Sequence, residues 1–205
     1  MATTTTRPRA TRNGSNRPSP DPRLDARGGE LQPFGTLRRL PIAMDEDGRG
    51  KSCEALDEIL ADSMILYAMY KKHHWLVAGP TFYQLHLLFD KHAEEQTELI
   101  DLLAERVQSL GGIAVGDPRH AAELTTIPRP PDGAEEVADM IDRTLQAHEI
   151  IIEKVRAAIK TTEEVEDWGS NDLLMGDVLR RHELQVWFLA EHVVPVPLVG
   201  EADGR

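Results

Sequence analysis

The sequence predicts an all-α fold, a four-helix bundle with a long crossover between the second and third helices. Apolar residues recur at spacings of three and four from Cys53 to Val193, and few stretches alternate with period two. Breaks at Gly79-Pro80 and Gly111-Gly112 divide this pattern. Residues 113–133 contain four prolines, which favours an extended crossover over another long helix.

The helices are expected in this order. The first carries an inward stripe from Leu56 to His74, and the second covers about residues 81–110. The third covers about residues 134–160, and the fourth about 170–192, before two prolines. Two helix pairs joined by one long crossover are typical of ferritin-like bundles, so we expect such a bundle over residues 51–193.

Charge divides the 205 residues into a basic start and an acidic body. The whole chain has 23 basic and 35 acidic residues, a net charge of −12. Residues 1–50 hold nine Arg, no Lys and six acids, which leaves the remainder at −15. Few apolar residues precede Leu31, so we expect a flexible N-terminal arm over 1–50, and a short C-terminal tail over 194–205.

The arm is a candidate DNA-binding segment. Its first twenty residues contain no acid and four arginines, Arg7, Arg9, Arg12 and Arg17, which can neutralise phosphates. A solubilising tail and a clamp on a neighbouring subunit are alternatives that the composition leaves open.

Several protein classes are excluded. The apolar runs are far shorter than the roughly 20 residues that span a bilayer, so no membrane association is expected. A single cysteine, Cys53, forms no internal disulfide or thiolate cluster, which favours a cytoplasmic protein. We expect Cys53 itself to be a passive thiol.

A polar stripe on the second helix carries the candidate metal ligands. His86 and Asp90 are four residues apart, as are Asp101 and Glu105, so each pair shares one helical face. His74 ends the preceding helix, close enough across the turn to add an imidazole. A merely solvated acidic face is the alternative interpretation.

Helix geometry predicts that such a site needs two chains. Asp90 and Asp101 are eleven residues apart, about 16 Å along a helix axis. One metal centre cannot contact both from the same chain. Two antiparallel copies related by a two-fold axis would place His86 and Asp90 of one chain against Asp101 and Glu105 of the other.

These residues resemble the Dps family, small ferritins that form hollow dodecamers. The resemblance covers about residues 50–193 and rests on spacings of 12, 4, 11 and 4 residues among the five candidate ligands. Further matching residues are His74-Trp75, Gly79-Pro80, Phe82, Phe89-Asp90, Ala104-Glu105-Arg106 and Gly111-Gly112.

The resemblance implies a homo-oligomeric ferroxidase with intersubunit sites. Two histidines and an aspartate, His74, His86 and Asp90, would come from one subunit, and Asp101 and Glu105 from its partner. Each site would oxidise Fe(II), preferentially with hydrogen peroxide, and the cage would store the Fe(III) as mineral and so protect against oxidative stress. Mixed imidazole and carboxylate ligands suit iron chemically.

The other histidines resemble those of a histidine-rich branch best known from cyanobacteria. His92 and His182 are candidate extra ligands, although a hydrogen-bonded histidine in the core is the commoner outcome for an apolar stripe. A site richer in nitrogen would also accept Zn as a competitor of iron. By family analogy, Asp167, Asp172 and Asp177 would line a pore; ordinary acids at a helix start are the alternative.

Three functions therefore remain open. The first is the ferroxidase and iron store. The second is a DNA-binding, nucleoid-associated protein that acts through its arms, with oxidation secondary. The third is a structural cage with an inactive centre.

Overall fold

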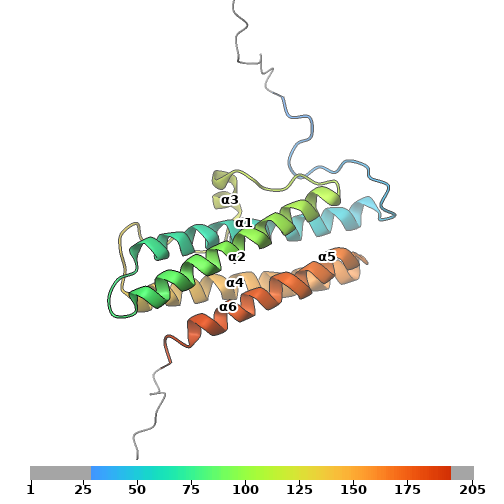
Figure 1. The fold of residues 1–205 in the computed structure, drawn as a ribbon. Coiled ribbons are helices and arrows are strands. Elements are labelled where there is room, and N and C mark those ends of the chain that lie inside the picture. The colour runs from blue at the N-terminus through green and yellow to red at the C-terminus, as the bar shows by residue number, and fades with distance from the viewer. Residues whose placement is uncertain (1–28, 195–205) are drawn as a thin grey trace, which may run out of the picture. The chain divides into compact units, whose positions relative to one another are not determined.

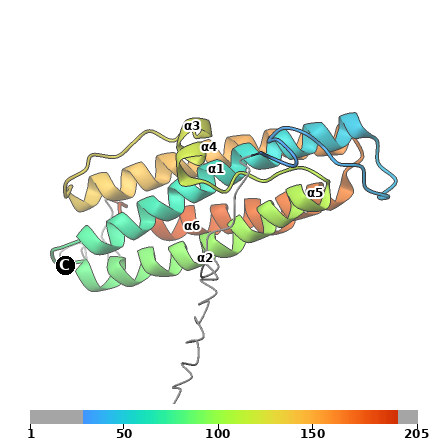
Figure 2. The same cartoon turned by 90° about the horizontal axis from the view of Figure 1, so that it is seen from above.

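The computed structural model describes residues 29–194, which form helices and connecting segments without a β-strand in that range. Four long helical segments lie side by side (Figures 1 and 2). They are α1 (Glu46–Leu76), α2 (Phe82–Ser109), α4 (Val137–Glu164) and a last segment composed of α5 (Trp168–Leu173), the π-helical turn η1 (Leu174–Leu179) and α6 (Arg180–Ala190). α1 packs against α2 and α4, and α4 packs against α6. The predicted ferritin-like bundle is confirmed.

The core lies between these segments and follows the predicted stripes with local shifts. Leu56, Leu60 and Tyr70 of α1 are fully buried, but Tyr67 is 37% exposed and the neighbouring Leu66 is buried in its place. The reason is that a helix repeats every 3.6 residues, so a strict alternation of fours and threes drifts off the buried face. None of the helices in residues 29–194 is long and apolar enough to cross a membrane.

The bundle begins before residue 51, the boundary that the sequence suggested. Asp45 caps α1 by accepting a hydrogen bond of 2.7 Å from the Gly48 N–H. The last carbonyls of a helix lack partners within it, and the segment before α1 and the first turn of α1 supply donors at the end of α2. Thus Arg38 donates its N–H to the Gly111 carbonyl (2.9 Å), and the Arg49 guanidinium donates to that of Leu110 (2.8 Å).

Contact with the segment before α1 also explains why residue 111 is a glycine. Gly111 has φ +92°, and a Cβ there would lie 2.5 Å from the Arg38 carbonyl oxygen. The predicted flexible arm thus overlaps with structured chain from Gln32 onward, while residues 1–28 lie outside the described residues.

The crossover contains a short helix, α3 (Pro118–Leu124), where its four prolines had favoured an extended segment. Asp117 caps it, and Pro118 is its first residue, where a missing N–H costs nothing. Two buried aspartates of α1 hold the crossover. Asp57 accepts from the Val115 N–H (2.9 Å), and Asp62 accepts from the Thr125 hydroxyl (2.6 Å).

Candidate metal centre

The end of α1 and the start of α2 bring two candidate ligands together. Their connection is a tight turn in which Gly79 has φ +95°, a conformation that glycine adopts without strain. The turn lays the His74 and His86 rings face to face, with centroids 3.9 Å apart and planes 18° from parallel. Both side chains are partly buried.

Reciprocal hydrogen bonds determine the tautomer of both rings. Nδ1 of His74 lies 2.8 Å from the His86 carbonyl oxygen, and Nδ1 of His86 lies 2.9 Å from the His74 carbonyl oxygen. A carbonyl oxygen can only accept, so Nδ1 carries a proton in each ring, and Nε2 is the nitrogen that bears the lone pair in the neutral form of the ring. This is the orientation in which backbone carbonyls usually hold metal-binding histidines.

Asp90 is the third candidate ligand near this turn. Its Oδ1 lies 3.9 Å from Nε2 of His74. The same oxygen accepts a hydrogen bond of 2.5 Å from the Lys71 ammonium, which lowers the pKa of the Asp90 carboxyl below its usual value. The carboxylate is therefore ionised at neutral pH, and Lys71 holds a positive charge where a metal cation would approach.

Asp101 and Glu105 lie elsewhere on the chain. Both are exposed on α2, two and six residues after the buried Leu99. Eleven residues of helix, about 16 Å, separate Asp101 from Asp90. Within residues 29–194 no group of three or more His, Cys, Asp and Glu side chains is close enough to hold a metal ion. One chain thus presents the two predicted halves of the site at two separate places.

His92 and His182 do not join His74 and His86. Both are fully buried in the core, where they belong to a chain of hydrogen bonds with Tyr70 and His148. This matches the core interpretation of these two histidines. The difference arises because His92 is two residues after Asp90, so the helix turns its side chain inward, away from the polar stripe.

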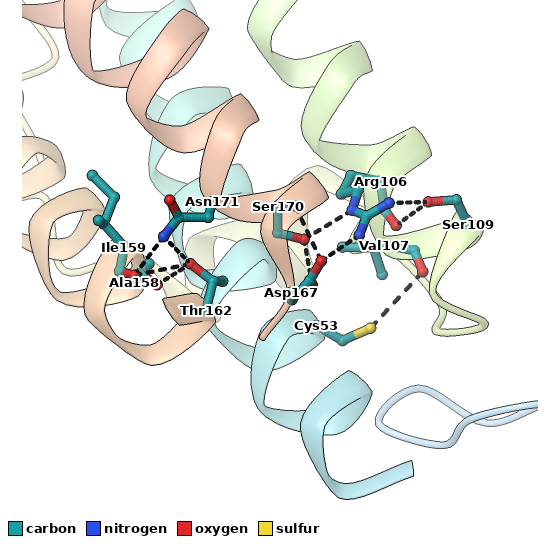
Figure 3. A network of polar contacts seen from close by, with 10 residues as sticks. All are labelled: Cys53, Arg106, Val107, Ser109, Ala158, Ile159, Thr162, Asp167, Ser170 and Asn171. Carbon is teal, nitrogen blue, oxygen red and sulfur yellow. Dashed lines mark hydrogen bonds and ion pairs between the residues drawn. The ribbon is translucent and has the colours of Figure 1, made fainter. Parts of the chain in front are cut away.

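The three aspartates near the fourth helix differ among themselves. Asp167 is 3% exposed; its carboxylate caps α5 through Ser170 and pairs with the Arg106 guanidinium of α2 (Figure 3). It has the capping role that was the alternative to a pore. Asp172 and Asp177 are exposed, on α5 and η1, and their pore role stays a prediction.

Cys53 lies next to this network and is 7% exposed, with its Sγ 3.8 Å from the Val107 carbonyl oxygen (Figure 3). Burial raises the pKa of its thiol to about 11, so the unreactive protonated form prevails at neutral pH. The DNA-binding candidates Arg7, Arg9, Arg12 and Arg17 lie outside the described residues.

Sequence reasoning missed Lys71. Its signal was available, since Lys71 precedes His74 by three residues and such residues share a helix face. A lysine is not a metal ligand, so its place on this helix face does not by itself predict the ion pair with Asp90.

Comparisons with known proteins show that the chain is similar to ferritin-like proteins. The model of the ferritin-like domain matches residues 53–199. An uncharacterized protein of Kitasatospora aureofaciens is 61% identical over 137 residues, 67% of this chain and 91% of the relative. A nutrient stress-induced DNA-binding protein of Nostoc is 31% identical, over 75% of this chain and 83% of the relative. The structure of DpsC from Streptomyces coelicolor matches with a TM-score of 0.82 and 58% identity, over 83% of this chain and 99% of the other.

Proposed function

This chain belongs to the Dps family of ferritin-like proteins, and we propose that it is a ferroxidase that oxidises Fe(II) with hydrogen peroxide. We further propose that it stores the Fe(III) as mineral inside a homo-oligomeric cage, a dodecamer, in the cytoplasm. One observation carries the proposal: His74 and His86 each hydrogen-bond a backbone carbonyl through Nδ1, and Asp90 lies beside His74. Two imidazole lone pairs and one carboxylate are half of a ligand set that suits iron.

The other half would come from a second subunit. Asp101 and Glu105 are exposed and share a face of α2, so an antiparallel partner helix would present them to His86 and Asp90 of the first chain. Fe(II) then enters as substrate, displaces the Lys71 ammonium from Asp90 and binds His74 and His86 through Nε2. A pair of Fe(II) ions supplies both electrons that peroxide needs, so no hydroxyl radical is released.

Absorbance of Fe(III) tests the proposal. Protein loaded anaerobically with Fe(II) receives peroxide, and wild type is compared with Asp101→Ala/Glu105→Ala. We expect fast oxidation in wild type and loss in the variant. The matched control is Asp142→Ala/Glu149→Ala, which removes the same charge from exposed positions of α4 and should oxidise iron normally. Equal, slow oxidation in all three proteins would contradict the proposal.

Mixed assembly tests the intersubunit geometry itself. Chains with Asp101→Ala/Glu105→Ala and chains with His86→Ala/Asp90→Ala are each inactive alone. In a mixed dimer one site would combine both intact halves and the other both damaged ones, so a random equal mixture would recover about a quarter of the sites. No recovery, with mixed assembly verified by mass, would contradict sites shared between chains.

A second candidate function is DNA binding through the N-terminal arm. It is favoured by the four arginines in an acid-free stretch and by the DNA-binding name of the Nostoc relative. Each arm that neutralises four phosphates would give a slope of about −3.6 in log affinity against log salt concentration. A gel-shift assay should therefore show salt-sensitive binding that deletion of residues 1–20 removes; unchanged binding after deletion would contradict it.

A further inference from the structure

A tyrosine and three histidines form one buried cluster, called here the core Tyr-His cluster: Tyr70, His92, His148 and His182. They come from α1, α2, α4 and α6, so each long segment of the bundle contributes one polar side chain. All four side chains are fully shielded from solvent. The proposed iron chemistry uses none of them.

The Tyr70 hydroxyl is the centre of the hydrogen bonds in this cluster. It lies 2.5 Å from Nε2 of His148 and 3.1 Å from Nδ1 of His92. His148 in turn places its Nδ1 2.8 Å from Nδ1 of His182. Each of these contacts holds one proton, so the hydroxyl donates to one histidine and accepts from the other. When it donates to His148, His148 must carry its own proton on Nδ1 and donate it to His182.

The cluster is uncharged at neutral pH. Burial lowers the pKa of His92 to about 4 and that of His182 to about 3, and it raises the pKa of Tyr70 well above its ordinary value. Isolated buried charges would be costly, and neutral rings avoid that cost. The phenol therefore keeps its proton, and it has a neutral imidazole nitrogen within hydrogen-bonding distance to receive it.

This arrangement meets the requirement for oxidising a phenol. Removal of one electron from a phenol makes its proton strongly acidic, so oxidation at neutral pH proceeds readily where a base takes the proton at the same time. A side chain positioned at hydrogen-bond distance can accept such a proton. His148 has that position, and the proton can move onward to His182.

Tyr70 is also close to the candidate metal centre. It precedes His74 by four residues on α1, about 6 Å along the helix axis. Its ring centroid lies 6.1 Å from that of Phe89, the residue before Asp90. An electron would therefore cross only about one helical turn between the phenol and the iron ligands.

We propose that Tyr70 donates one electron to the oxidant that forms when peroxide meets a single Fe(II) at the centre. The inference rests on the proposed ferroxidase function. One Fe(II) gives peroxide one electron, and the products are Fe(III), a hydroxide ion and a hydroxyl radical. Tyr70 reduces that radical to a second hydroxide ion, its phenolic proton moves to His148, and a tyrosyl radical remains.

The cycle closes with a second Fe(II). This ion returns one electron to the tyrosyl radical and becomes Fe(III), and the proton returns from His148 to the phenolate oxygen. The sum is two Fe(II) and one peroxide converted to two Fe(III) and two hydroxide ions, as in the reaction of an iron pair. Tyr70 thus protects a half-loaded site from releasing hydroxyl radical.

Electron paramagnetic resonance tests the proposal. The chain has three tyrosines, and the other two, Tyr67 and Tyr83, are exposed to 37% and 69%. Tyr67→Phe/Tyr83→Phe therefore leaves Tyr70 as the sole tyrosine without changing the core. After less than one Fe(II) per site and then peroxide, freeze-quenched wild type and this double variant should show a tyrosyl radical that Tyr70→Phe loses. Its formation should be slower in D₂O, since a proton moves with the electron.

The outcomes separate the two proposals. Iron oxidation with no tyrosyl signal in the double variant, or with a signal from the exposed Trp75 indole alone, overturns the role of Tyr70 and leaves the ferroxidase standing. Absence of peroxide-driven iron oxidation in wild type overturns the ferroxidase. Photo-oxidation with ruthenium tris(bipyridine) and persulfate needs no iron; failure to produce the Tyr70 radical there overturns the inference whatever iron does.

Discussion

Histidines occur in two different settings in this bundle, at its rim and in its core. At the rim, His74 and His86 donate Nδ1–H to backbone carbonyls, and Nε2 of His74 lies 3.9 Å from the Asp90 carboxylate. In the core, His92, His148 and His182 are fully buried and use their ring nitrogens to contact Tyr70 or one another.

The comparison shows that the neighbours of a histidine decide its chemistry. A carbonyl partner imposes one tautomer, with the proton on Nδ1, and leaves Nε2 as the nitrogen that could bind a metal. An imidazole or phenol partner can donate or accept, so the core histidines can pass a proton from one ring to the next.

The largest expected effect comes from removing a rim ligand. His86→Ala should slow peroxide-driven Fe(II) oxidation by at least about a hundredfold, because even partners of metal ligands are usually worth 10–100-fold. Thermal stability should change little, since the side chain is partly exposed. Stopped-flow absorbance measures the rate, and His192→Gln, an exposed histidine of the C-terminal segment, is the control. A His86→Ala protein with the wild-type rate would show that the rim histidines do not bind iron.

Acid should destabilise the protein through the core. Burial lowers the pKa of His73 and His92 to about 4 and of His182 to about 3, from an ordinary value of 6.5. Below about pH 6.5 the unfolded chain therefore binds more protons than the folded protein. The free energy of unfolding is at its full value above that pH and falls as pH decreases towards 4. Each such histidine adds about 1.4 kcal/mol per pH unit to this loss.

Denaturant unfolding between pH 7 and 4 measures this dependence. His92→Gln keeps an amide near the Tyr70 hydroxyl but cannot titrate, so its stability should depend less steeply on pH than that of wild type. His192→Gln should keep the wild-type slope. Identical slopes in all three proteins would mean that the core histidines titrate normally.

The smallest effect is expected from Lys71. Lys71→Met removes the cation that pairs with Asp90, so Fe(II) no longer has to displace it, and anaerobic titration should show affinity raised several-fold. Partly exposed ion pairs contribute only about 0.2–1 kcal/mol of interaction free energy, which limits the gain in Fe(II) affinity. Lys91→Met is the control: Lys91 follows Asp90 but pairs with Glu95 instead, so its loss should leave affinity unchanged. Weaker binding in Lys71→Met would show that Lys71 supports the site.

The sequence alone determined the helical pattern, the crossover and the five candidate ligands. Periodicities of three and four, and breaks at glycine and proline, depend only on local backbone chemistry and so can be read along the chain. The spacing of Asp90 and Asp101 is likewise a property of a single helix, and it indicates a two-chain site without any tertiary structure.

Only the tertiary structure decided what the other polar residues do. Lys71 of α1 pairs with Asp90 of α2, Asp167 pairs with Arg106 of α2, and His148 of α4 contacts Tyr70 of α1, so each contact joins two helical segments. A hydrogen bond depends on where two side chains meet, and contacts between helices follow from packing rather than from spacing along one helix. The position of a histidine on a helix therefore indicates whether its side chain is buried. The residue that it contacts in the folded protein determines whether the ring is suited to bind metal or to transfer a proton.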